Sequence, residues 1–402
     1  IQVMETPGHP SVYADWLHAD GAPAVLLYGH FDVQPVPDPA VWSSDPFQPD
    51  FRDGRVYARG SSDMKCQLLA SLLAIEDLLA EDGRLPVNVR VLFEGEEETL
   101  SPNLRGLVSG MRDRLQADFA VTADGQQPVA GRPRIGVGSR GFCDLEVHVQ
   151  TADGDLHSGT YGGTVRNAAR TLGELIAGLY SADGRVAVDG FYDDVDVPSH
   201  EERVLLAGEL EAAAAQGAVL GSTGEPGWSA WERATLRPSL EVNGLIGGYT
   251  GPGPMTVVPA RALAKLSCRL VPDQDPDAVR RLVGDHLVRH APPDVRVTVV
   301  RGGASVPAYR CRRDHPVVTA AASVLREMSS GEPELAISGG SLPVQAYLKA
   351  ELGVSTITFG FSTDDEGAHG IDEFHRLESF TDARAAYRRL YAELGRAPVE
   401  EA

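Results

Sequence analysis

The sequence is poor in cysteine, and its few cysteines lie far apart. Cys66, Cys143, Cys268 and Cys311 are the four cysteines among 402 residues, and no two of them form a CxxC pair. Zinc–thiolate sites use closely spaced cysteines, so this spacing argues against such a site and for reduced thiols. A secretory signal pattern is missing as well. We therefore expect a cytoplasmic protein.

Long apolar runs and positive charge are also lacking. No stretch approaches the ~20 consecutive apolar residues that span a bilayer. The formal net charge is −21, so nucleic-acid backbones and anionic membranes repel the chain. The composition therefore predicts no membrane span and no nucleic-acid or membrane partner.

Hydrophobic residues are plentiful enough to build two domains with their own cores. They make up 43% of the 402 residues, a proportion typical of globular chains of this size. The chain starts at Ile1 rather than Met and enters structured sequence almost at once. We therefore expect a further N-terminal segment to precede it.

The first third of the chain alternates strand and helix patterns. Strands are predicted at residues 25–28, 56–58, 87–93 and 119–122, and a helix at 64–80. This alternation predicts α/β architecture with a mostly parallel central sheet. Sites in such folds form where the parallel strands end.

From about residue 135 the pattern changes to a smaller antiparallel sheet with helices on one face. Strands are predicted at 145–149, 239–242, within 255–271 and at 295–299, and helices at 165–180 and 277–290. Residues 181–236 form a polar, alanine-rich insertion. The α/β pattern then returns, with helices at 315–328 and 380–394 and a strand at 355–359. We predict one α/β domain of residues 1–134 and 308–402, split by an inserted α+β domain of residues 135–307.

The most informative segment is His30-Phe31-Asp32, directly after the apolar run at 25–28. Side chains two positions apart on a strand share one face. His30 and Asp32 can therefore converge, with the imidazole facing a metal ion and the carboxylate fixing its other nitrogen.

Further acidic residues and a histidine follow, and each of them could have a purely structural role instead of binding a metal ion. Asp63 precedes the predicted helix, where an aspartate is often only a cap. The run Glu94-Gly-Glu96-Glu97-Glu98 is by itself typical of a solvated turn, although a bound cation would relieve its repulsion. Asp124 and His369 are each compatible with ordinary loop residues. Together with His30, however, they offer two imidazoles and three carboxylates, enough for two metal ions that share one carboxylate.

These residues lie in five motifs that carry a family resemblance. The motifs are Leu27-Tyr-Gly-His30-Phe-Asp32-Val-Gln-Pro35, Gly60-Ser-Ser-Asp63-Met-Lys65, Glu94-Gly-Glu-Glu97-Glu98, Asp155-Leu-His157-Ser-Gly-Thr-Tyr-Gly-Gly163 and Gly367-Ala-His369. In this order, over nearly the whole chain, they resemble the dinuclear zinc exopeptidases. That family includes carnosinase, bacterial dipeptidases, glutamate carboxypeptidase, aminoacylase and succinyl-diaminopimelate desuccinylase. The carnosinase-like dipeptidase branch matches best.

The resemblance implies two divalent metal ions per subunit. Zn²⁺ is the default, and the mostly oxygen ligands also suit Mn²⁺ or Co²⁺. His30 and Asp124 would hold one ion. Glu98 and His369 would hold the other, and Asp63 would bridge the two.

The resemblance also assigns the proton chemistry at this site. Glu97 would be the general base, and Asp32 would orient His30. The peptide bond between Asp63 and Met64 is implied to be cis. The α/β domain would be a phosphorylase/hydrolase-like catalytic domain.

The inserted domain is implied to be a lid that also forms a homodimer. His157 resembles a lid histidine that reaches the partner's active site and stabilises the oxyanion, although without the resemblance a surface histidine is the better reading. The residues that resemble binders of the substrate carboxylate are Asn243, Arg269, Gly339, Gly340 and Ser341. Two positions depart from the family pattern: Cys66 stands where glycine is usual, and the arginine that often precedes Gly339 and Gly340 is missing.

The sequence therefore predicts a metal-dependent hydrolase of dipeptides or short peptides with a free C-terminal carboxylate. One alternative keeps the metal site and acts on N-acyl amino acids instead. A remoter alternative is a non-catalytic, peptide-binding dimeric scaffold, although every ligand position and the base are filled.

Overall fold

The computed structural model describes residues 1–129, 131–200, 203, 224–329 and 331–399. They form two compact units. The first comprises Ile1–Gly138, Arg310–Ile337 and Leu342–Ala402, and the second Ser139–Tyr309 and Ser338–Ser341. The domain boundaries expected at 134/135 and 307/308 stay a prediction. Part of the expected insertion at 181–236 lies outside the described residues.

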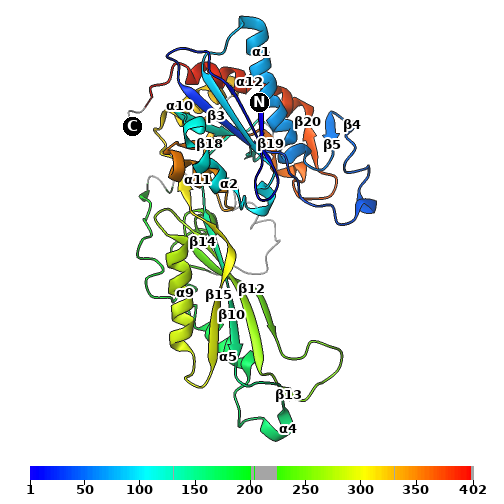
Figure 1. Cartoon of the computed structure of the whole chain (residues 1–402), viewed down its shortest axis with the longest axis vertical. Helices are drawn as coiled ribbons and strands as arrows, with labels where there is room; N and C mark the ends of the chain where they lie inside the picture. Colours follow the sequence, from blue (N-terminus) through cyan, green and yellow to red (C-terminus); the bar gives the residue numbers. More distant parts are fainter. Residues whose placement is uncertain (130, 201–202, 204–223, 330, 400–402) are drawn as a thin grey trace. The chain divides into compact units, whose positions relative to one another are not determined.

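A nine-stranded sheet organises the first unit in the described part of the chain (Figure 1). Its order is β1 (Gln2–Met4), β2 (Ser11–Trp16), β6 (Asn88–Glu94), β3 (Ala24–His30), β7 (Phe119–Thr122), β18 (Thr356–Thr358), β9 (Arg134–Ser139) and β16 (Tyr309–Arg310), with β17 (Glu334–Ser338) paired to β9. The four central strands β6, β3, β7 and β18 run parallel. The predicted α/β class is confirmed, and the sheet is mixed because β1, β2 and β9 pair antiparallel.

Helices cover both faces of the central strands, which explains why these strands read as continuous apolar runs. Leu26 and Tyr28 pack in one core with helices α2 (Leu104–Gly110), α3 (Arg112–Leu115) and α11 (Pro343–Leu352). Gly29 faces the other way, where an added Cβ would meet Met64, just before α1 (Cys66–Asp82), and Leu68 in its first turn. Helix α1 packs against α12 (Leu377–Leu394), which in turn packs against α10 (Pro316–Met328) (Figure 1).

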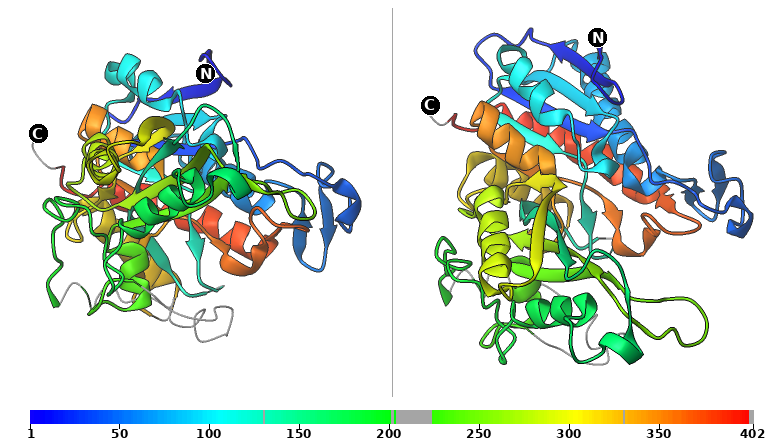
Figure 2. Two further views of the ribbon diagram at one scale, coloured as in Figure 1. Left: turned by 90° about the horizontal axis from the view of Figure 1, so that it is seen from below. Right: turned by 60° about the horizontal axis from the view of Figure 1, so that its bottom comes forward.

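The second unit contains a four-stranded antiparallel sheet, as the sequence predicts for an α+β domain. The order is β12 (Ser239–Gly247), β14 (Arg261–Leu270), β10 (Gly141–Gln150) and β15 (Arg296–Val306). Alternate residues of β10, from Cys143 to Val149, pack in one core with α5 (Ala168–Ala177) and α9 (Pro276–His290). Both helices therefore lie on the same face of this sheet (Figure 2).

Several boundaries differ from the sequence-based expectation for identifiable reasons. Helix α1 begins at Cys66 rather than 64, because Asp63 and Met64 have non-helical backbone angles in the wide turn η2 (Ser61–Lys65). The peptide bond between Asp63 and Met64 is cis, as the resemblance implies. Helix α5 begins at Ala168 rather than 165, because the Asn167 side chain caps it by accepting from the Arg170 amide. Strands β1, β2, β9 and β17 and helices α2 and α11 carry weak periodicity and were not predicted.

Shorter elements complete the description. They are β4 (Asp50–Arg52), β5 (Arg55–Tyr57), β8 (Gln126–Gln127), β11 (Leu156–His157), β13 (Val257–Val258), β19 (Ser362–Thr363), β20 (Phe374–Arg376), α4 (Ser158–Tyr161), α8 (Ala230–Thr235), η1 (Pro39–Val41), η3 (Glu97–Thr99) and η4 (Asp364–Glu366). Among the residues described, no helix combines the length and the apolar character needed to cross a bilayer.

Candidate metal centre

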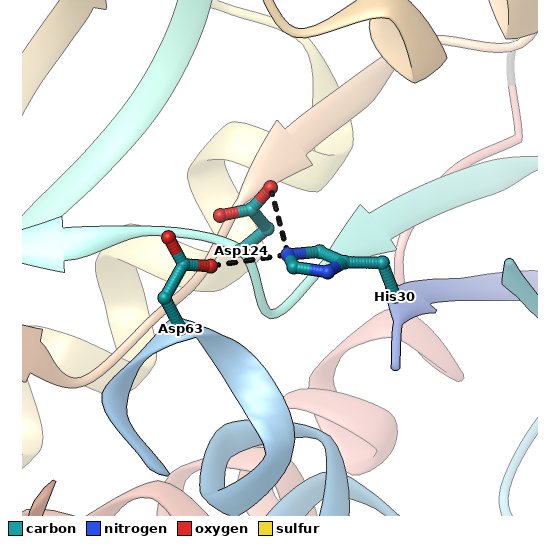
Figure 3. A group of neighbouring side chains, drawn as sticks. All are labelled: His30, Asp63 and Asp124. Atoms are coloured by element: carbon teal, nitrogen blue, oxygen red, sulfur yellow. Dashed lines mark hydrogen bonds and ion pairs between the residues drawn. The ribbon is translucent and has the colours of Figure 1, made fainter. Parts of the chain in front are cut away.

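The first group of candidate ligands gathers at the ends of β3 and β7. His30 is the last residue of β3 and its side chain is buried, while Asp124 follows β7. The imidazole Nε2 of His30 lies 3.0 Å from Asp63 Oδ1 and 4.0 Å from Asp124 Oδ2. Figure 3 shows the three side chains pointing toward one another. The three predicted residues therefore form a group whose ligand atoms can reach one ion.

A second group shares Asp63 with the first. The other carboxylate oxygen of Asp63, Oδ2, lies 3.1 Å from His369 Nε2. The same nitrogen lies 3.1 Å from Glu98 Oε2. The Asp63 carboxylate thus places one oxygen in each group, which is the arrangement that a bridging ligand requires. It accepts hydrogen bonds from two histidines instead of capping α1.

Asp32 orients both His30 and the loop that carries Glu97 and Glu98. Its Oδ1 lies 3.3 Å from His30 Nδ1, on the ring edge opposite Asp63. The same carboxylate accepts from the backbone amide of Glu97 at 3.2 Å and of Glu98 at 3.0 Å. Asp32 therefore fixes the ring and places the two glutamates. Such outer partners set ligand direction and basicity in metal sites.

Glu97 is held close to the ligands in an environment that disfavours its charge. Burial, followed by the negative charge of Asp124, raises the pKa of Glu97 to about 9. Its backbone amide is bonded to Asp32, so its position is tied to that of His30. Glu97 is half-buried, and a carboxylate with a perturbed pKa beside candidate ligands is a candidate for proton transfer.

The electrostatics of the group fit bound cations. Burial and the neighbouring Asp63 charge raise the pKa of Asp124 to about 7, and burial also raises the pKa of Glu98. Burial alone would lower the pKa of His30, but Asp32 and Asp63 outweigh it and raise that pKa to about 12. In addition, Glu98 Oε1 is buried without a hydrogen-bond partner. Imidazole and carboxylate donors with this surplus of negative charge suit divalent ions such as Zn²⁺ or Mn²⁺.

The four glutamates at the end of β6 and directly after it do not act as one cluster, which corrects the idea that a cation relieves them all. Glu94 turns into the first unit's core, where it accepts from the Tyr28 hydroxyl and from Ser101 Oγ. Glu96 accepts from the amide of His9 at 3.0 Å and from Asn103 Nδ2 at 2.8 Å. Only Glu97 and Glu98 remain near the candidate ligands.

Two supporting side chains were missed by the sequence analysis. Gln34 donates to Glu98 Oε2 at 2.8 Å and lies in the first motif, so its position next to Asp32 was an available signal. Glu373 accepts from the backbone amide of Asp63 at 3.0 Å across 310 positions of sequence. No local pattern marks Glu373.

In the second unit, the residues expected to bind a carboxylate lie partly together. Arg269 donates to Ser341 Oγ at 2.9 Å and packs over the ring of Phe142. The carbonyl of Gly339 accepts from Arg140 Nε at 3.0 Å. The Gly340 amide already donates to Ser338 Oγ. In this conformation the N–H of Gly340 is therefore not available to a substrate carboxylate. Arg140 holds this loop, a role that the sequence did not reveal.

Asn243 and His157 lie elsewhere in the second unit. Asn243 occupies the register shift between Val242 and Gly244 on β12, and its side chain is exposed. Such a bulge redirects a side chain away from regular pairing. His157 ends β11, is exposed, and accepts at Nδ1 from the Gly159 amide at 3.1 Å. The structure describes these positions without testing their predicted roles.

Comparison with known proteins places this site in a family context. The model of peptidase family M20/M25/M40 matches residues 26–393. A solved M20 family metallo-carboxypeptidase from Sulfolobus solfataricus is similar over 98% of this chain and 90% of its own, with 31% identity and a TM-score of 0.87.

Curated relatives with dipeptidase names are also similar. The Beta-Ala-His dipeptidase of Rattus norvegicus is 28% identical over 98% of this chain and 81% of its own length. The Cys-Gly metallodipeptidase of Schizosaccharomyces pombe is 28% identical over 94% of this chain and 81% of its own. The residues matched by the family model, 26–393, include every candidate ligand from His30 to His369.

Proposed function

The chain belongs to peptidase family M20/M25/M40, and from this membership we propose that it is a metal-dependent dipeptidase. Relatives named as Beta-Ala-His and Cys-Gly dipeptidases support this activity over the removal of acyl groups from amino acids. The observation that carries the proposal is the Asp63 carboxylate, whose two oxygens face His30 and His369 separately.

We propose that the site holds two Zn²⁺ ions. His30 and Asp124 hold one ion, Glu98 and His369 hold the other, and Asp63 bridges them. When bound, such a pair polarises a carbonyl and lowers the pKa of water. The two ligand groups and the buried, unpartnered Glu98 Oε1 support this assignment.

The proton transfers fall to Glu97 in this proposal. Glu97 takes a proton from the water that adds to the scissile carbonyl, and it returns the proton to the leaving nitrogen as the C–N bond breaks. Asp32 keeps His30 and the Glu97 amide in place through its Oδ1. A pocket of about 320 Å³ lined by Phe31, Gln34 and Glu98, among others, offers space for a small substrate.

The second unit supplies substrate binding and dimerisation in this proposal. Arg269 binds the substrate carboxylate with its planar fork, assisted by Asn243 and the loop of Gly339, Gly340 and Ser341. A homodimer forms through this unit, and His157 reaches the partner's active site to stabilise the oxyanion. Exposed Leu245 and Ile246 on the edge strand β12 support the dimer. A cytoplasmic location is supported by the lack of any disulfide among the four cysteines, all within the described residues.

Hydrolysis of small peptides by metal-stripped and reloaded protein tests the proposed activity. We expect β-alanyl-histidine or cysteinyl-glycine to be cleaved after reloading with Zn²⁺ or Mn²⁺, and not in the presence of a chelator. A C-terminally amidated dipeptide should lose about 10²-fold or more in kcat/KM, because it leaves the half-buried Arg269 without its carboxylate partner.

N-acetyl amino acids and a tripeptide serve as the comparison substrates. Faster turnover of the N-acetyl compounds would contradict the dipeptidase assignment in favour of a deacylase. Faster sequential release of C-terminal residues from the tripeptide would instead identify a carboxypeptidase.

Mixing two inactive variants tests the role of His157. We expect His157→Ala to lower kcat by about 10²–10³-fold, as the loss of an oxyanion donor does. If His157 acts across the dimer, re-pairing this variant with Glu97→Gln restores about a quarter of wild-type activity, because half of the random dimers regain one complete site. A mixture no more active than its two components would rule out action across the dimer.

A further inference from the structure

The loop that carries Asp63 is fastened by a buried carboxylate from the C-terminal part of the chain. Glu373 lies just before β20, and its side chain is 1% exposed. Its Oε1 accepts from the amides of Ser62 at 2.9 Å and Asp63 at 3.0 Å. Its Oε2 accepts from the Gly60 amide at 2.9 Å. Three backbone donors between Gly60 and Asp63 therefore converge on one side chain.

Arg59 extends this connection to the loop that carries His369. One guanidinium nitrogen, Nη1, donates to Glu373 Oε2 at 2.7 Å. The other, Nη2, donates to the carbonyl of Gly370 at 2.8 Å, one residue after His369. The Arg59 side chain is 4% exposed and lies over the ring of Trp42. A planar fork joins two acceptors in fixed directions, which a lysine cannot do.

Asp63 and His369 are the residues whose relative placement must be right for a shared carboxylate. They come from segments 306 positions apart in the sequence, and their side chains lie 3.1 Å apart. The Arg59–Glu373 pair bonds directly to the backbone next to both. Neither Arg59 nor Glu373 is a candidate ligand, so their contribution acts through the ligands they hold.

We propose that Glu373 and Arg59 are positioning residues that set the geometry of Asp63 and His369 for metal binding. This inference rests on the proposed metal site but not on the identity of the peptide substrate. Burying an ion pair costs desolvation free energy. The Arg59–Glu373 pair offsets this cost by bonding to four backbone groups, the three amides on Glu373 and the Gly370 carbonyl on Arg59. Partners of this kind, outside the ligand shell, typically change metal affinity or activity by about 10–100-fold when mutated.

Glu373→Gln is the sharpest test because each of the two carboxylate oxygens accepts two hydrogen bonds. In either orientation the amide NH₂ faces two donors, so one pair of bonds must break. We expect Co²⁺ affinity to fall about 10–100-fold, with a changed visible spectrum of the bound Co²⁺. At saturating metal, kcat should fall while KM stays within a few-fold, because the substrate-binding residues are untouched.

The second unit offers a matched control pair, Arg237 and Glu225. Their side chains are 5% and 7% exposed, they bond at 2.7 and 2.8 Å, and Arg237 lies over Trp228. Glu225→Gln should therefore lose comparable thermal stability while keeping wild-type Co²⁺ affinity and spectrum. If Glu373→Gln and Glu225→Gln lost Co²⁺ binding equally, general destabilisation of the protein would explain the loss. That result would overturn the inference.

Wild-type Co²⁺ affinity and spectrum in Glu373→Gln would also overturn it. Should that variant not fold, Arg59→Lys replaces it, and unchanged Co²⁺ binding in Arg59→Lys would count equally against the inference. Wild-type protein that binds Co²⁺ but cleaves no dipeptide would contradict the proposed function alone. The comparison of metal binding between the variants would still decide the role of Glu373.

Discussion

Glu97→Gln is expected to lower kcat by about 10²–10⁴-fold, because the side chain keeps its shape but cannot accept a proton. Metal content should stay at the wild-type level, since Glu97 belongs to neither ligand group. Single-turnover hydrolysis together with elemental analysis of the same sample separates the two effects.

The pH profile adds a second readout for Glu97. A base must be ionised, so the wild-type rate should fall as the pH drops through the pKa of Glu97. Burial and Asp124 hold that pKa at about 9 without bound cations, and cations nearby shift it lower. The acid limb of the profile should therefore lie below pH 9 and should vanish in Glu97→Gln. Wild-type turnover by this variant at full metal loading would remove Glu97 from the mechanism.

Asp63→Ala is expected to abolish metal-dependent hydrolysis. Each ligand group loses one of its three members, because the two Asp63 oxygens serve His30's group and His369's group separately. The loss of activity should exceed the loss of about 100-fold that follows mutation of a residue outside the ligand shell. Calorimetric titration with Zn²⁺ should show both binding steps weakened, and Asp63→Asn, which keeps one carbonyl oxygen, should weaken one step more than the other.

Asp118→Ala provides the control for Asp63. Asp118 accepts from the Ala24 amide at 2.7 Å, at the start of the strand that ends in His30. The loss of this hydrogen bond should lower the free energy of unfolding by about 1 kcal/mol, the usual contribution of one such bond. The number of Zn²⁺ ions bound should not change. If Asp63→Ala still bound two ions with wild-type affinity, the shared-carboxylate arrangement would be wrong.

Local sequence accounted for much of the architecture and for the candidate ligands. The apolar run before His30 is buried on both faces and ends where the imidazole is needed, so strand, burial and ligand position follow from one segment. Asp63, Glu98 and His369 could be identified from the sequence because each lies in a short motif, and both the motifs and their order can be read along the chain. The antiparallel strands β1 and β2 escaped because β1 pairs with β2 and β2 pairs with β6, and this pairing supplies order that their own periodicity does not.

What the sequence alone determined is which chemical groups reach the ends of the central strands, because a side chain's type and its place along a strand are local properties. Only the tertiary structure decided how the carboxylates divide their work. Glu94 and Glu96 bind hydroxyl, amide and backbone donors, while Glu97 and Glu98 stay with the ligands. Likewise, Glu373 reaches Asp63 only through folding across 310 positions. A carboxylate's role depends on the donors around it, and packing between distant segments sets those donors.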